Sequence, residues 1–309
     1  MDLVYKIIHE ALKPAGYKAK TVSITRLPEI QESVAALIRE GAISRRLSDS
    51  WHFYRTPNTR LPEAKTIIIA ALPQSITRLT FSRQGRDYSG EVAPADYSLT
   101  DELLLEETLK KALESTGYTI KKARLPLKTL AVRSGLSRYG KNNIAYVPGM
   151  GSFCRLIAFY TDASCTEDNW QASGVMKACD NCLLCRDTCP NGSITGDRFL
   201  IHAENCLGFL QEKQPEFPYW VQYQPDRPNA FIGCMRCQSV CPANKPYLKS
   251  IRAGSSFSEE ETALILNKTP WERLPPETRE KLEDIRGIYT LIECNLSALI
   301  EKQRQQIKA

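Results

Sequence analysis

Eight of the eleven cysteines in this chain are spaced so that their thiolates can hold iron–sulfur clusters. The first run consists of Cys179, Cys182, Cys185 and Cys189. It is followed by a proline and has the spacing C-x2-C-x2-C-x3-C-P that is typical of bacterial ferredoxins. The second run consists of Cys206, Cys234, Cys237 and Cys241. It keeps the C-x2-C-x3-C-P ending, but its first cysteine lies far upstream.

The two runs predict two [4Fe–4S] clusters whose ligands cross over between the runs. In two-cluster ferredoxins, the cysteine that precedes the proline binds the cluster of the other run. We therefore expect one cluster on Cys179, Cys182, Cys185 and Cys241. We expect the second cluster on Cys206, Cys234, Cys237 and Cys189. Because the ligands are exchanged, both clusters should lie in one small fold.

Zinc and disulfides explain the same cysteines less well. A closed zinc site needs four ligands rather than eight, and a proline after the last cysteine has no role at zinc. Disulfides require an oxidising compartment. Residues 1–6 lack the basic segment and following apolar segment of a signal peptide. No apolar run approaches the length of a membrane span. The sequence therefore predicts a cytoplasmic protein with no membrane partner.

The composition is that of an ordinary globular protein. Of the 309 residues, 42% are hydrophobic and 25% are charged. The formal net charge of +6 is modest and suits an anionic cofactor, an acidic electron donor or nucleic acid without choosing among them.

The first half of the chain alternates helices with buried strands. Apolar residues recur at helical spacing over 3–12 and 28–40, and a capping-box pattern begins a longer helix over 101–115. The isoleucine-rich run 66–72 and the apolar run 155–160 predict buried strands. This alternation indicates an α/β domain over residues 1–170.

The remaining residues predict a ferredoxin-like double-cluster domain over 171–250 and a helical C-terminal tail over 251–309. The insert 207–232 contains four prolines, which favour an ordered loop over a regular helix. Apolar residues at helical spacing over 277–302 predict helix, and we expect two helices from Ser258 onward.

Several segments match the pattern of one known family. Residues 233–244 match a G-C-x-x-C-Q-x-V-C-P-x-N string, and Cys206 stands at the position of a displaced cysteine. Residues 134–142 are similar to a glycine-rich A-G-L-G-x-x-G-K-N segment, and residues 151–153 match a glycine–serine step before the next strand. Together with residues 61–65 and 269–273, these segments resemble the epoxyqueuosine reductase family over most of the chain. That family reduces an epoxide on a modified tRNA base with cobalamin and two [4Fe–4S] clusters.

The resemblance implies a fold, a cofactor and a set of contact residues. The α/β domain is expected to be nitroreductase-like and to bind cobalamin, and a ferredoxin or flavodoxin is expected to donate electrons. Gly140, Lys141 and Asn142 are the expected corrinoid contacts, together with Gly151 and Ser152. Polar residues in this pattern also form capped turns between a helix and a strand, which is the structural alternative.

Two departures from the family pattern concern the substrate. Residues 121–128 contain no acidic side chain, where the family carries an aspartate that is its proposed proton donor. A family D-Y-H string appears as residues 96–98 without the histidine, which leaves Tyr97 as the candidate catalytic proton donor. The alternative for Tyr97 is a packed tyrosine at a helix start.

We therefore expect an iron–sulfur oxidoreductase, a cobalamin-dependent reductase whose substrate is a different small molecule or modified nucleoside. The alternative is a non-catalytic electron-transfer protein, or a reductive activator of another protein's corrinoid. A tRNA-binding module is a third interpretation, which the modest net charge and the short tail do not favour.

Overall fold

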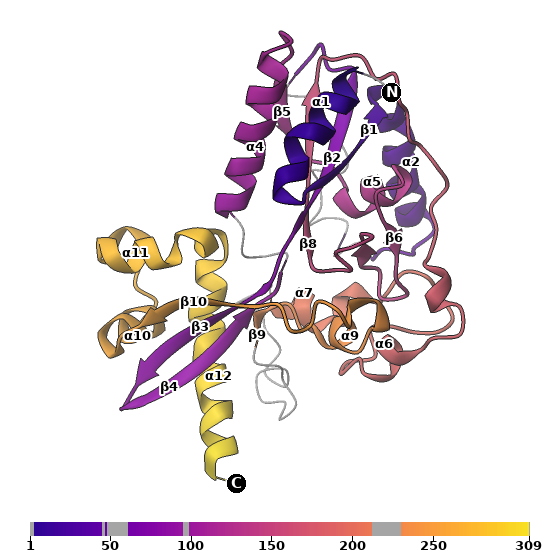
Figure 1. Cartoon of the computed structure of the whole chain (residues 1–309). Coiled ribbons are helices and arrows are strands. Elements are labelled where there is room, and N and C mark those ends of the chain that lie inside the picture. Colours follow the sequence, from indigo (N-terminus) through magenta and orange to yellow (C-terminus); the bar gives the residue numbers. More distant parts are fainter. Residues whose placement is uncertain (1–2, 45–46, 48–60, 95–98, 212–229, 309) are drawn as a thin grey trace. The chain divides into compact units, whose positions relative to one another are not determined.

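The chain forms two compact units, each built from two separate stretches of sequence. A computed structural model describes residues 3–44, 47, 61–94, 99–211 and 230–308 (Figure 1). Unit 1 comprises Met1–Pro73 and Thr100–Cys182, and unit 2 comprises Gln74–Leu99 and Leu183–Ala309. Tyr97 and the four prolines of the insert lie outside the described residues.

Unit 1 is built on a four-stranded antiparallel sheet with the strand order β1-β2-β8-β5. Its strands are β1 (Lys18–Ser23), β2 (Thr66–Pro73), β5 (Ile120–Ala123) and β8 (Cys154–Thr161). Its helices are α1 (Leu3–Leu12), α2 (Leu27–Arg39), α4 (Leu99–Glu114) and α5 (Leu127–Arg133). The helices and strands predicted over 3–12, 28–40, 66–72, 101–115 and 155–160 are all present, within two residues at each end.

Strand β2 is buried on both faces because its side chains alternate between two cores. Ile67 packs in one core with Ile30 of α2 and with side chains of α5. Ile68 packs in the other core with Ile8 of α1 and with side chains of α4. The sheet is therefore covered by helices on both faces, which explains the continuous apolar run in the sequence (Figure 1).

Unit 2 contains a second four-stranded sheet with the order β10-β3-β4-β9. Its strands are β3 (Ile76–Arg83), β4 (Arg86–Val92), β9 (Ala230–Ile232) and β10 (Ile251–Phe257). β3 and β4 form a hairpin, and Gln84 and Gly85 at its turn both have positive φ angles, 53° and 68°. Such a turn matches the twist of the two strands. β10 and β9 add to the hairpin as parallel strands on its two sides.

The C-terminal helices pack on this second sheet. They are α10 (Glu259–Leu266), α11 (Pro276–Leu282) and α12 (Tyr289–Lys308), and Ser258 begins α10 with a capping box. The ring of Phe81 on β3 stacks on Phe257 at 4.7 Å between centroids, and Leu296 of α12 belongs to the same core. The helical structure expected from Ser258 onward is present, but as three α-helices instead of two. These helices form a core with strands instead of a separate tail. None of the described helices is long and apolar enough to cross a membrane.

The hairpin of β3 and β4 lies in the range 1–170, which we expected to form one α/β domain. In the structure it belongs to unit 2, because Leu79 and Phe81 are completely buried against the C-terminal helices. The strands β1, β5, β9 and β10 were likewise not predicted from the sequence. The prediction of a loop over the whole insert 207–232 was wrong at its described ends, which form helix α7 (Leu207–Gln211) and strand β9.

Candidate iron–sulfur and cofactor sites

The two cysteine runs have the same local fold. Each C-x2-C pair leads into a four-residue helix, α6 (Leu184–Asp187) in the first run and α9 (Arg236–Ser239) in the second, and the two helices contact each other. The amide of Cys189 donates to the Arg186 carbonyl at 3.1 Å. The amide of Cys241 donates to the Gln238 carbonyl at 3.3 Å. The helical turn thus places the cysteine that precedes each proline.

Cys206 and Cys234 lie close together in unit 2, although 28 positions separate them in the sequence. Cys206 comes directly before α7 (Leu207–Gln211), and Cys234 follows β9 after Gly233. A β-carbon added to Gly208 would lie 3.8 Å from the Cys206 Sγ atom and 3.7 Å from the backbone nitrogen of Cys234. Leu207 is buried and packs against Cys234. The two chain segments therefore run against each other.

The Cys234 thiol lies near two other thiols of the expected second set. The pKa of the Cys234 thiol is raised to about 11, chiefly by burial. A backbone hydrogen bond from Arg236 opposes the rise, and the charges of Cys206 and Cys189 contribute to it. Neighbouring thiolates repel one another, and a bound cation removes this repulsion. The amide of Ser193 donates to the Cys189 Sγ atom at 3.2 Å, a contact that tunes sulfur ligands of clusters.

This donor set fits an iron–sulfur cluster. None of the ten cysteines whose side chains the structure describes forms a disulfide. Among the described residues, no three His, Cys, Asp or Glu side chains are placed to hold a single metal ion. A [4Fe–4S] cluster is larger than a single metal ion, so its four thiolate ligands lie farther apart than the ligands of one ion. The assignment of Cys237 and of the other individual cysteines to each cluster stays a prediction.

Two of the ligands expected for the first cluster belong to unit 1. Cys179 and Cys182 belong to unit 1, and Cys185 and Cys241 belong to unit 2. In unit 1, Cys179 ends a 3-10 helix (Lys177–Cys179), and the Cys182 amide donates to the Cys179 carbonyl at 3.2 Å. This ligand set also stays a prediction.

The glycine-rich segment forms a tight hairpin between β6 (Arg138–Tyr139) and β7 (Ala145–Tyr146). Gly140 donates to the Ile144 carbonyl at 2.9 Å, and a β-carbon on Gly140 would lie 2.6 Å from the Asn142 Oδ1 atom. Asn142 is only 3% exposed. Its amide nitrogen donates to the Tyr146 hydroxyl at 3.0 Å, and its oxygen accepts from the Ile144 amide at 3.3 Å. Asn142 therefore stabilises the turn, as the structural alternative requires.

Lys141 points from this hairpin to the first cysteine run. Its ammonium group donates to the Asp180 carbonyl at 3.0 Å and to the Cys182 carbonyl at 3.3 Å. The hairpin and the first half of the first cysteine run are therefore in direct contact within unit 1.

The other expected cofactor contacts lie just before β8. Gly151 has a φ angle of 59° and exchanges backbone hydrogen bonds with Val147. Ser152 follows it and is 6% exposed. Ser137, which precedes β6, was not singled out from the sequence. Its hydroxyl is buried and has no hydrogen-bond partner in the described part of the chain.

The stretch without an acid, residues 121–128, spans the end of β5 and the start of α5. The nearby carboxylate of Glu102 on α4 is paired with Lys122 and Arg155. Burial opposes the ionisation of Glu102, but the two cations outweigh burial and hold its pKa below the ordinary value. Glu102 is therefore a carboxylate at neutral pH and does not replace the missing acid.

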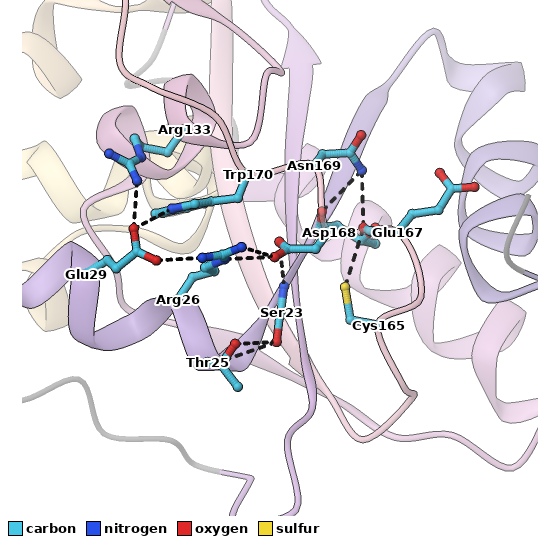
Figure 2. A network of polar contacts seen from close by, with 11 residues as sticks. Ser23, Thr25, Arg26, Glu29, Arg133, Cys165, Glu167, Asp168, Asn169 and Trp170 are labelled. Atoms are coloured by element: carbon cyan, nitrogen blue, oxygen red, sulfur yellow. Dashed lines mark hydrogen bonds and ion pairs between the residues drawn. The ribbon is translucent and has the colours of Figure 1, made fainter.

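A polar network in unit 1 fixes the chain that leads from β8 to the first cysteine run (Figure 2). Glu29 accepts hydrogen bonds from the Trp170 indole at 2.7 Å and from Arg133 at 2.8 Å. The Arg133 guanidinium lies 4.4 Å from the centre of the Trp170 ring, and Arg26 pairs with Asp168 at 2.7 Å. These partners come from distant parts of the sequence, so no local pattern could reveal the network.

After Trp170, backbone hydrogen bonds attach residues 171–176 to Arg133 and to strand β6. Gln171 donates to the Arg133 carbonyl at 2.7 Å, and Tyr139 exchanges hydrogen bonds with Gly174 and Met176 at 3.0 and 2.8 Å. The segment before Cys179 is thus held along β6, beside the glycine-rich hairpin.

The comparisons with known proteins match the two cysteine runs and the fold. The family described as 4Fe-4S double cluster binding domain matches residues 178–244, which contain all eight cysteines of the two runs. The epoxyqueuosine reductase of Bacillus subtilis is 28% identical over 200 residues, which are 62% of this chain and 50% of that protein. The epoxyqueuosine reductase of Cyclobacterium marinum is 28% identical over 197 residues, 60% of this chain and 59% of that protein. The chain thus spans about half the length of the curated relatives it matches.

Solved structures show the same fold. The epoxyqueuosine reductase from Streptococcus thermophilus superposes with a TM-score of 0.66 and 19% identity, covering 98% of this chain and 82% of that chain. A crystal structure of an epoxyqueuosine reductase with an epoxyqueuosine-modified tRNA stem loop gives a TM-score of 0.59 and 19% identity, with coverage of 96% and 81%. The comparisons therefore support an epoxyqueuosine reductase-like family, and residues 178–244 match a 4Fe-4S double cluster binding domain.

Proposed function

We propose that this protein is an iron–sulfur oxidoreductase that passes electrons through two [4Fe–4S] clusters to a corrinoid in unit 1, and that its substrate is not epoxyqueuosine. The observation that carries the proposal is the convergence of Cys189, Cys206 and Cys234, which come from three separate segments of unit 2. The proposed electron donor is a ferredoxin or flavodoxin, and the net charge of +6 is compatible with such an acidic donor. The proposed location is the cytoplasm, where thiols stay reduced.

The residues around the glycine-rich hairpin fit a corrinoid in one respect. The orphan hydroxyl of Ser137 is a buried group that lacks a partner, and a ligand amide would satisfy it. The glycine at position 151 lets a ligand approach the backbone closely. A bound corrinoid would supply the reductive cobalt chemistry, while the protein would supply orientation and electrostatics.

The missing acid motivates the second half of the proposal. Opening an epoxide leaves an oxygen that must gain a proton, and a positioned acid accelerates such a step by about 10²–10⁴-fold. Residues 121–128 offer only lysine and arginine, and Glu102 is held as a carboxylate by Lys122 and Arg155. The lysine and arginine side chains of residues 121–128 favour an anionic small molecule or an anionic modified nucleoside over an epoxide.

An equilibrium titration with cobalamin, followed by its visible spectrum under anaerobic conditions, tests the corrinoid site. Ser137→Ala should weaken binding about twofold to thirteenfold, the effect of one net hydrogen bond of about 0.5–1.5 kcal/mol. The matched control is Ser134→Ala. Its hydroxyl is equally buried but already donates to the Ala131 carbonyl at 3.1 Å, so its loss should not change the affinity for cobalamin.

Activity on epoxyqueuosine-containing tRNA tests the substrate. We expect turnover at least about 10²-fold below that of the Bacillus subtilis relative, given the same reductant and added cobalamin. Turnover comparable to that of the relative would show that another group supplies the proton.

One observation favours the alternative of an electron carrier or a reductive activator of another protein's corrinoid. Two of the expected corrinoid contacts are engaged within the protein, Asn142 with Tyr146 and Lys141 with the first cysteine run. If the iron-complete protein shows no spectral change at saturating cobalamin, this alternative replaces the corrinoid proposal.

A further inference from the structure

Lys141 connects the glycine-rich hairpin with the segment that carries Cys179 and Cys182. We propose that Lys141 is a positioning residue for the first [4Fe–4S] cluster, which anchors this segment and places a positive charge that favours the reduced cluster. The inference rests on the proposed cluster assignment. It gives Lys141 a role that differs from the corrinoid contact expected from the sequence.

Lys141 extends from a rigid turn. Gly140 and Asn143 close the hairpin with backbone hydrogen bonds of 2.9 and 3.0 Å, and Asn143 has a φ angle of 55°. The buried Asn142 side chain braces the same turn from inside. Lys141 therefore stands on a turn that is fixed on both sides.

The Lys141 ammonium group binds the backbone of the first cysteine run. It donates to the carbonyls of Asp180 and Cys182, at 3.0 and 3.3 Å, so two backbone oxygens of the C-x2-C segment point at one cation. The preceding residues are held independently, since Met176 donates to the Tyr139 carbonyl at 2.8 Å. The segment between Met176 and Cys182 is thus attached to the hairpin at both ends.

The charge of Lys141 bears on the reduction of the cluster. A [4Fe–4S] cluster gains one negative charge when it accepts an electron, so a fixed cation nearby stabilises the reduced form. Net charge and hydrogen bonding around the sulfurs are known determinants of cluster potentials. Lys141 is half-buried, so solvent screens its charge only in part. Removing the charge should therefore disfavour reduction.

The test is an anaerobic redox titration of the iron-complete protein, with each cluster followed by electron paramagnetic resonance. In Lys141→Met and Lys141→Gln, the ratio of reduced to oxidised cluster at a fixed potential should fall about tenfold for one couple, which equals about 59 mV for one electron. Lys141→Arg keeps the charge and the donors and should stay within about twofold of the wild type. Lys177→Met is the matched control, because Lys177 is an exposed lysine two residues before Cys179. It should also stay within about twofold, since solvent screens an exposed charge.

The outcomes separate this inference from the proposed function. Loss of about four of eight irons in the Met and Gln variants, with full iron in Lys141→Arg, would also support the anchoring role. The proposal for Lys141 would be overturned if the iron-complete Lys141→Met and Lys141→Gln variants both kept the wild-type ratio of reduced to oxidised cluster. It would also be overturned if Lys141→Gln alone kept that ratio. Failure of Lys141→Arg to keep either the iron or the ratio would overturn it too. A wild-type protein without two clusters would instead refute the proposed function.

Discussion

Replacing Cys189 by alanine tests the crossed ligands most directly. Cys189 follows the first C-x2-C pair in the chain, but its charge acts on Cys234 together with that of Cys206. We expect Cys189→Ala to lose about four of about eight irons and the matching sulfides, because one of two cubanes loses a ligand. The substitution also removes the hydrogen bond from the Ser193 amide, worth about 1 kcal/mol. That is small beside the 5–15 kcal/mol that stabilise a typical domain, so the fold should survive.

Double variants identify which cluster is lost in Cys189→Ala. If Cys189 shares a cluster with Cys206, then Cys189→Ala combined with Cys206→Ala should still retain about four irons. Cys189→Ala combined with Cys179→Ala should retain almost none, because each substitution removes a different cluster. Iron and sulfide analysis after anaerobic reconstitution measures both. The crossed assignment would be refuted by almost no iron in the Cys189→Ala, Cys206→Ala variant together with about four irons in the Cys189→Ala, Cys179→Ala variant. That result would also contradict the grouping of Cys189 with Cys234.

Two further predictions concern the stability of the units. Glu102→Gln leaves Lys122 and Arg155 without their carboxylate and should lower the free energy of unfolding by about 1–3 kcal/mol in a denaturant titration, less than for a fully buried pair because both cations are partly exposed. Since the folded-state pKa of Glu102 is lowered, this difference should be present above pH of about 4.3 and vanish as the pH falls through the folded-state pKa. Gly90→Ala would place a β-carbon 2.0 Å from the buried Phe231 ring and should cost about 1–3 kcal/mol, whereas Gly287→Ala, with no atom within 4 Å, should be nearly neutral.

The sequence predicted those elements whose burial is uniform along one strand or one helix face. Strand β2 was found because both of its faces are covered, which leaves a continuous apolar run over residues 66–72. The hairpin of β3 and β4 was missed because polar residues interrupt its apolar ones, and its Gln84-Gly85 turn lacks the asparagine or aspartate of common hairpins. Its place in unit 2 follows from packing with helices about 200 residues later, which no local pattern contains.

The candidate site likewise has features that local sequence predicts and features that depend on packing. Cysteine spacing is local chemistry, so the double-cluster domain could be predicted from the sequence alone. The contact of Lys141 with Asp180 and Cys182 joins residues about 40 positions apart and depends on how the hairpin packs. The orphan hydroxyl of Ser137 is visible only once its surroundings are known.

The lack of an acid that could protonate the opened epoxide is the strongest physical argument for a substrate other than an epoxide. Burial raises the pKa of Tyr139, although a hydrogen bond with Thr129 opposes the rise, and burial raises the pKa of Tyr160 to about 12. A phenol with a raised pKa is a poorer acid, and Glu102 is already ionised. Tyr97, which lies outside the described residues, therefore stays the candidate proton donor. If the protein does reduce epoxyqueuosine, Tyr97→Phe should lower the rate by about 10²–10⁴-fold. Retention of the full rate in that variant would show that the proton comes from a different source, such as water.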